Sequence, residues 1–150
     1  MATIQVLLVD DEDSFLRAYT TLLEEEGMNT IIADNGLDAL RIIDEHPLDV
    51  VILDIKMPGL DGIEVLRKTK QTHPLVEVIM VTGNASVEST IEGLRLGAFD
   101  YLVKPVDLSV LVTKVNEAYA KKEAVEEKIR KAETEQIIRH PWAVFGRKRK

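Results

Sequence analysis

Short apolar runs alternate five times with longer stretches of helical spacing along the first 120 residues of the chain. Each run is bounded by turn signals, which is typical of a strand buried in a parallel sheet. The predicted strands are Thr3–Val9, Met28–Ala33, Val50–Asp54, Val76–Val81 and Phe99–Val103. The predicted helices are Ser14–Glu26, Gly36–Glu45, Gly62–Thr72, Ala85–Leu96 and a last helix that starts near Leu108. Five strand–helix units predict an α/β fold, a doubly wound parallel sheet with helices on both faces.

Several positions refine the predicted helices. Short side chains that accept hydrogen bonds from first-turn amides favour the N-cap position. The predicted N-caps are Asp13, either Asp34 or Asn35, and Asp107. Ile91 and Leu94 recur at helical spacing and are expected to be buried. Each histidine precedes a proline, which disfavours helical geometry, so we expect helix ends rather than metal or acid–base sites at His46, His73 and His140.

Polar side chains follow four of the predicted strands at the point where each strand ends. Carboxyl ends of parallel strands meet at one edge of a sheet, and ligands of open α/β sheets bind there. The side chains expected at this edge are Asp10, Asp11, Asp54, Thr82 and Lys104. Carboxylates on neighbouring strands repel each other unless a cation lies between them, and Mg²⁺ prefers such oxygen ligands. The sequence therefore predicts a Mg²⁺ site, with Lys104 and Thr82 placed to hold a phosphoryl oxygen.

Composition narrows the class of protein. The chain has 150 residues, 45% of them hydrophobic and 30% charged, and no cysteine, which excludes disulfides and cysteine metal sites. Residues 1–120 carry 9 Lys and Arg against 21 Asp and Glu, a net charge of −12, while residues 121–150 carry 10 against 5, a net charge of +5. The acidic part disfavours nucleic-acid binding by the main domain. No apolar run reaches membrane-spanning length and no signal peptide is apparent, so we expect a cytoplasmic protein.

The residues at this edge resemble the receiver domain of two-component response regulators. The matching residues are the acidic pair Asp10 and Asp11, the phosphoacceptor Asp54, the switch hydroxyl Thr82 and the pair Lys104 and Pro105. The loop Met57–Gly62 and the segment Gly97–Tyr101 also match the family pattern. The resemblance covers about Thr3 to Ala120, which predicts a receiver domain over residues 1–120 and a helical extension with a basic tail over residues 121–150. It also implies the strand order 2-1-3-4-5.

The resemblance implies a phosphorylation-activated switch. A sensor histidine kinase or a phosphotransfer protein would donate a phosphoryl group to Asp54, with Thr82 and Lys104 assisting. The implied Mg²⁺ ligands are Asp10, Asp11, Asp54 and the backbone carbonyl of Lys56. The implied switch residues, which would change the surface of the fourth helix, fifth strand and fifth helix for a downstream protein target, are Thr82, Tyr101 and Pro105. Mg²⁺-dependent autophosphorylation and autodephosphorylation at Asp54 are expected, although the chain would not be a conventional enzyme.

Two other α/β classes fit less well. A flavodoxin-like nucleotide binder needs a Ser, Thr or Gly phosphate loop after the first strand, where this chain has four consecutive acids, Asp10–Asp13. An aspartate-nucleophile phosphatase of the haloacid dehalogenase kind needs a second Asp two residues after the nucleophile, where this chain has Lys56.

The extension has features of its own. Positions spaced alternately by four and three residues predict either a coiled-coil seam, which would form a homodimer, or a solvated charged helix. These positions are Leu111, Val115, Ala118, Lys122, Val125, Ile129, Ala132 and Gln136. Pro141 is expected to end the helix, before an apolar cluster of Trp142, Val144 and Phe145 and the basic run Arg147–Lys150. An alternative function is therefore a dimeric scaffold or DNA-associated module that uses this tail as its output, or a fragment of a longer regulator.

Overall fold

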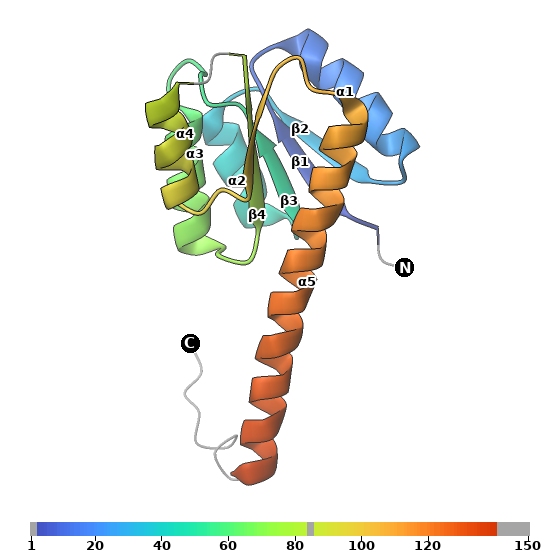
Figure 1. Ribbon diagram of the computed structural model, residues 1–150, viewed down its shortest axis with the longest axis vertical. Helices are drawn as coiled ribbons and strands as arrows, with labels where there is room; N and C mark the ends of the chain where they lie inside the picture. The colour runs from blue at the N-terminus through green and yellow to red at the C-terminus, as the bar shows by residue number, and fades with distance from the viewer. Residues whose placement is uncertain (1–2, 84–85, 141–150) are drawn as a thin grey trace.

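A five-stranded parallel sheet forms the centre of the computed structural model, which describes residues 3–83 and 86–140 (Figure 1). The strands, in spatial order, are β2 (Asn29–Ala33), β1 (Gln5–Val9), β3 (Val50–Leu53), β4 (Glu77–Thr82) and β5 (Asp100–Val103). The helices are α1 (Asp13–Glu25), α2 (Gly36–Glu45), α3 (Gly62–Thr72), α4 (Val87–Arg95) and α5 (Leu108–Arg139). The predicted fold class and the strand order 2-1-3-4-5 are confirmed.

The sheet separates two apolar clusters, because successive side chains of a strand point to opposite faces. On one face, Leu7 and Val51 pack with α2 and α3, and Tyr101 and Leu96 lie at the border of this cluster. On the other face, Val6 and Ile52 pack with α1 and α5. Figure 1 shows the same division, with α2, α3 and α4 on one side of the sheet and α1 and α5 on the other. Apart from Gln5, the residues of the central strands β1, β3 and β4 are almost completely buried.

Most of the predicted helix ends are confirmed. The Asn35 side chain caps α2 by accepting a hydrogen bond from the Asp38 amide, 2.9 Å away, and the Asp107 side chain caps α5 through the Ser109 amide at 2.8 Å. The three histidines lie at the C-caps of α2, α3 and α5.

Two local predictions are wrong. Asp13 is the first residue of α1 rather than its cap, since Asp10 accepts a hydrogen bond from the Glu12 amide at 2.8 Å and the helix begins directly afterwards. Ile91 and Leu94 are 47% and 49% exposed. The core-facing side of α4 is narrow, and among its described residues only Gly93 is buried.

Helix α5 has two parts with different surroundings. Leu111, Val115 and Ala118 are fully buried against the sheet, so the first predicted seam positions pack within the domain itself. The C-terminal part of α5 projects away from the domain (Figure 1). The predictions for Pro141 and for the apolar and basic groups after it lie outside the described residues. Within residues 3–83 and 86–140, no helix has the length and apolar character needed to cross a membrane.

Candidate functional site

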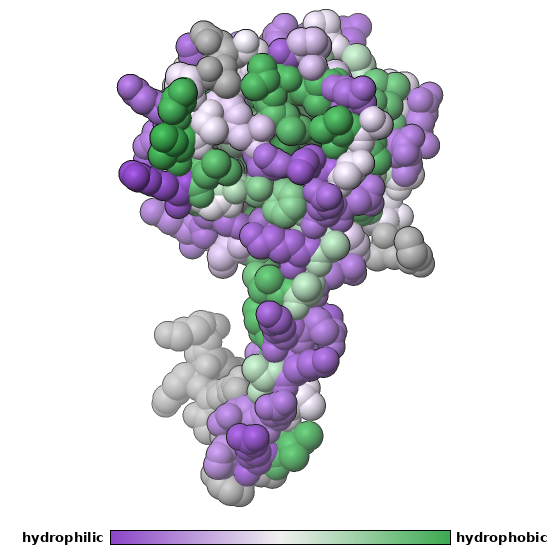
Figure 2. All heavy atoms as spheres, in the orientation of Figure 1, coloured by the Kyte–Doolittle hydropathy of each residue, from purple (hydrophilic) through white to green (hydrophobic). Residues whose placement is uncertain are grey.

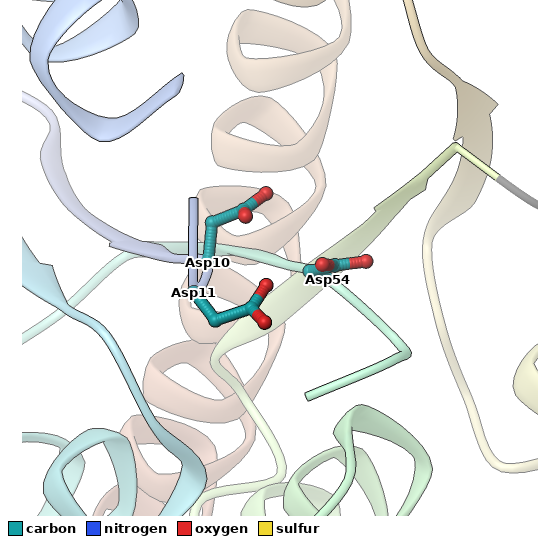
Figure 3. A group of neighbouring side chains, drawn as sticks. All are labelled: Asp10, Asp11 and Asp54. Atoms are coloured by element: carbon teal, nitrogen blue, oxygen red, sulfur yellow. The ribbon is translucent and has the colours of Figure 1, made fainter. Parts of the chain in front are cut away.

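Three carboxylates meet where β1 and β3 end, as the sequence predicts. Val9 pairs with Leu53 in the sheet register, so Asp10 and Asp54 follow neighbouring strands at the same edge. The Asp54 amide donates a hydrogen bond to the Val9 carbonyl at 3.0 Å, which extends the ladder to the site. One carboxylate oxygen from each of Asp10, Asp11 and Asp54 lies within 4.8 Å of the others, and Figure 3 shows the three side chains gathered at this edge.

The lysine that follows β5 reaches the same group of acids. The ammonium nitrogen of Lys104 lies 2.6 Å from Asp10 Oδ2 and 2.7 Å from Glu12 Oε1. It also lies 4.3 Å from the centre of the Phe15 ring. The Lys104 amide donates to the Thr82 carbonyl at 2.8 Å, and the peptide bond to Pro105 is cis. Burial opposes the charge of Lys104, but hydrogen bonds to Asp10 and Glu12 outweigh it and raise its pKa. The side chain is therefore held as an ammonium beside the carboxylates.

The environment of Asp54 makes its negative charge costly. The residue is 6% exposed, and burial, followed by repulsion from Asp10, raises its pKa from 3.8 to about 6. The Lys104 ammonium and a hydrogen bond from the Lys56 amide act in the opposite direction. One ammonium thus faces three aspartates, which leaves an excess of negative charge at this edge.

This donor set fits a hard divalent cation. Asp10 is 1% exposed and Asp54 is 6% exposed, whereas Asp11 is exposed, so solvent reaches the cluster at Asp11. Mg²⁺ binds through one or two carboxylates, keeps several waters and accepts a phosphoryl oxygen in addition. The acidic pocket is therefore of the kind that holds Mg²⁺, while the Lys56 carbonyl as a further ligand stays a prediction.

Two of the predicted switch residues lie in the neighbouring strands β4 and β5, and the third lies on the loop after β5. Thr82 is the last residue of β4, is 1% exposed and pairs with Val103 of β5. Tyr101 lies in β5 with its ring half-buried, and its hydroxyl oxygen is 3.0 Å from Ser89 Oγ on α4. Pro105 is exposed on the loop that leads to α5.

Sequence reasoning missed two neighbours of the site. The sequence indicates Glu12 only as part of an acidic run, and its contact with Lys104, 92 residues further along the chain, has no signal in local spacing. Gly62 ends a segment that matches the family pattern, but the sequence does not indicate its steric role. A Cβ atom at Gly62 would lie 2.1 Å from the backbone carbonyl oxygen of Asp54, so only glycine lets α3 begin this close to the site.

Comparison with known proteins gives a consistent result. Residues 6–116 match the family model of the response regulator receiver domain. The regulatory protein AtoC of Escherichia coli K12 is 44% identical over 108 residues, which cover 71% of this chain and 23% of that protein. The transcriptional regulatory protein ZraR of the same organism is 33% identical over 144 residues, which cover 96% of this chain and 32% of ZraR. The chain therefore spans only a quarter to a third of the length of these relatives.

A solved structure gives the same answer for the fold. The crystal structure of a CheY-like response regulator receiver domain protein from Methanospirillum hungatei JF-1 superposes with a TM-score of 0.80 at 33% sequence identity, covering 82% of this chain and 98% of that one. These matches favour the receiver interpretation over the scaffold or DNA-associated alternative. The chain belongs to the response regulator receiver domain family.

Proposed function

We propose that this chain is a phosphorylation-activated response regulator that accepts a phosphoryl group on Asp54 from a sensor histidine kinase or a phosphotransfer protein. The observation that carries this proposal is the cluster of Asp10, Asp11 and Asp54, with the Lys104 ammonium beside it, at one edge of the sheet. Phosphoryl transfer needs positioning and charge neutralisation more than covalent chemistry from the protein. The site offers both.

Each residue has a distinct role in the proposed reaction. A carboxylate oxygen of Asp54 attacks the phosphorus atom, the new P–O bond forms as the P–N bond of the donor phosphohistidine breaks, and the imidazole nitrogen takes the electron pair. With a pKa of about 6, Asp54 is mainly ionised at neutral pH and acts as the nucleophile. Lys104 and Thr82 stabilise the transferred phosphoryl oxygens. Asp10, Asp11, Asp54 and the Lys56 carbonyl would hold Mg²⁺, which when bound supplies charge neutralisation at the phosphoryl group.

Hydrolysis of the acyl phosphate returns the chain to its starting state. Water attacks the phosphorus atom and the Asp54 carboxylate leaves, so that inorganic phosphate is released. Addition and loss of a phosphoryl group both take place at Asp54, and the chain acts as a switch with a slow self-directed activity rather than as a conventional enzyme.

The output surface proposed for this switch is formed by α4, β5 and α5. Large apolar side chains are exposed on these three elements, and Figure 2 shows apolar residues gathered over α4. They are Val87, Ile91, Leu94, Val103 and Val110. An exposed apolar patch of this kind is typical of a protein-binding surface. We infer that phosphorylation changes this surface through Thr82, Tyr101 and Pro105 and that a downstream protein target binds it, in the cytoplasm.

The division of the chain is part of the proposal. Residues 1–120 form the receiver domain, and residues 121–150 form an extension whose base is attached to the domain by ion pairs. Lys122 lies 3.1 Å from Asp49, and Lys121 lies 3.6 Å from the buried Glu77. Beyond this base, a second copy of the chain would pair along the remaining seam positions Val125, Ile129, Ala132 and Gln136.

Mass spectrometry of the intact protein tests the proposed function. After incubation with acetyl phosphate and Mg²⁺, the wild type should gain one phosphoryl group, and omission of Mg²⁺ should abolish the gain. Asp54→Asn should gain none, while Asp44→Asn, whose exposed side chain lies on α2 and contacts His73, should behave like the wild type. Labelling of Asp54→Asn would contradict the assignment of the phosphoacceptor.

A further inference from the structure

Three hydroxyl groups connect the start of α4 to strand β5. Ser86 is the N-cap of α4, and its Oγ accepts a hydrogen bond from the Ser89 amide at 3.0 Å. The Ser86 hydroxyl donates to Ser89 Oγ at 2.9 Å, and Ser89 Oγ lies 3.0 Å from the Tyr101 hydroxyl. The Ser89 hydroxyl also donates to the Ser86 carbonyl at 3.2 Å. Either hydroxyl can be the donor in the bond between Ser89 and Tyr101.

The same face of α4 contacts the Tyr101 ring. Ser89 and Gly93 are four residues apart and therefore lie above one another on the helix. A Cβ atom at Gly93 would lie 3.9 Å from Cδ2 of Tyr101, so the ring passes close to the bare backbone of this residue. The ring is thus held against α4 at two points, by packing at Gly93 and by a hydrogen bond at Ser89.

These contacts lie close in the sequence to Thr82, the predicted switch hydroxyl. Thr82 ends β4, and α4 begins with its N-cap at Ser86, four residues later. Tyr101 lies in β5, beside Met80 of β4 in the sheet register. A displacement of Thr82 toward a phosphoryl group would therefore act on the first turn of α4, where both serines lie.

We propose that Ser89 is a positioning residue that holds Tyr101 against α4 in the unphosphorylated chain, and that the Ser89–Tyr101 hydrogen bond opposes the change to the phosphorylated conformation. This inference rests on the proposed function, since it concerns the regulation of the same site. Without this bond, the change to the phosphorylated conformation breaks one contact fewer. The equilibrium between the two conformations therefore shifts toward the phosphorylated one.

The experiment measures the affinity of the full chain for beryllofluoride, an analogue of the phosphoryl group, in the presence of Mg²⁺. Ser89→Ala should bind beryllofluoride about 3- to 10-fold more tightly than the wild type, the effect of one ordinary hydrogen bond. Ser89→Thr keeps the hydroxyl and should restore the wild-type affinity. Thr90→Ala is the matched control, since the Thr90 hydroxyl also donates to the Ser86 carbonyl, at 2.8 Å, and its described bonds do not include Tyr101.

A double-mutant cycle separates positioning from a general effect on helix α4. In a Tyr101→Phe background the Tyr101 hydroxyl is absent, so Ser89→Ala should leave the affinity unchanged. The inference would be overturned if Ser89→Ala and the wild type bound beryllofluoride equally well. It would also be overturned if Thr90→Ala increased the affinity as much as Ser89→Ala, or if Ser89→Ala increased it equally in the Tyr101→Phe background. Failure of the wild type itself to bind beryllofluoride would overturn the proposed function as well, which distinguishes the two failures.

Discussion

The ammonium group of Lys104 lies 2.6 Å from the carboxylate of Asp10 and thereby neutralises the more buried of the two acids that follow β1. Asp54 is left with a carboxylate that is buried, repelled by Asp10 and only partly compensated, so its pKa is about 6. The site is therefore built at a cost to the stability of the unphosphorylated protein, as is common where function needs like charges close together.

Asp54→Asn should stabilise the protein at neutral pH in the presence of EDTA. The folded pKa is raised above the ordinary value of 3.8, so the stability associated with protonated Asp54 is present below pH 4 and is lost as the pH rises through about 6. The substituted side chain is uncharged at every pH, so the variant should gain about 3 kcal/mol in free energy of unfolding at pH 7.5 and little at pH 4. Urea unfolding at both pH values measures this difference, and equal stability at pH 7.5 would contradict the raised pKa.

Mg²⁺ should stabilise the wild type through the acidic cluster. Since a ligand that binds only the folded state raises the free energy of unfolding, the melting temperature should increase with Mg²⁺ concentration. Asp11→Asn should weaken Mg²⁺ binding about tenfold, because carboxylate oxygens are the preferred ligands. Asp13→Asn is the control, since its side chain is 72% exposed and pairs with Arg17. A similar loss in both variants would point to general surface charge rather than a site.

Gly62→Ala should damage both the fold and the site. The new Cβ atom would lie 2.1 Å from the Asp54 carbonyl oxygen and 2.7 Å from Ile55 Cα, so either α3 or the backbone at Asp54 must move. We expect a loss of about 2–4 kcal/mol in free energy of unfolding and slower labelling of Asp54 by acetyl phosphate. Gly83→Ala is the control, because no described atom lies within 4 Å of its Cβ position. Equal tolerance of the two alanines would show that the close approach is not required.

Lys122→Met should loosen the base of the α5 extension. The Lys122 side chain is 14% exposed and its partner Asp49 is 16% exposed, so the substitution leaves a partly buried carboxylate without its cation. We expect a loss of about 1–2 kcal/mol in urea unfolding, since Asp49 retains the hydrogen bond from the Gln5 amide. Arg130→Met breaks an exposed pair with Glu127 and should cost less than about 0.5 kcal/mol. Equal losses would mean that burial does not strengthen the Lys122 pair.

Ile129→Asp should separate the proposed homodimer. Ile129 lies on the predicted seam and is 43% exposed, so a charge there would prevent pairing of two α5 extensions. Ile138→Asp is the control, because Ile138 is 72% exposed and lies off the seam. Sedimentation velocity of the full-length variants should show a monomer for Ile129→Asp and a dimer for Ile138→Asp and the wild type. A wild-type monomer would leave the solvated charged helix as the correct interpretation.

The sheet and the cluster of acids could be predicted because both depend on short-range patterns. Apolar runs such as Val50–Leu53 identify central strands. The carboxyl ends of parallel strands lie at the same edge of a sheet, and this does not depend on the conformation of the loops. The start of α1 could not be predicted from local sequence, because several acids follow one another there and the hydrogen bond from the Glu12 amide to Asp10 decides where the helix begins.

Predictions about burial failed where an apolar helix face could either pack on its own domain or remain on the surface. Ile91 and Leu94 have the spacing of a core face, but the sheet contacts α4 mainly through Gly93, and the two apolar side chains remain on the surface. The heptad spacing of α5 likewise begins with Leu111, Val115 and Ala118, which pack on the chain's own sheet. Periodicity identifies an apolar stripe, but it does not say whether the stripe meets the same domain or another molecule.

The continuity of α5 has a mechanical consequence. At about 1.5 Å per residue, the part of the helix beyond Lys122 extends roughly 25 Å from its ion-paired base. A rigid rod of that length converts a tilt of about 5° at the base into a displacement of roughly 2 Å at its tip. The first turns of α5 also form part of the proposed output surface. A rearrangement there that is too small to alter the shape of the domain therefore moves the far end of the helix far enough to make or break contacts.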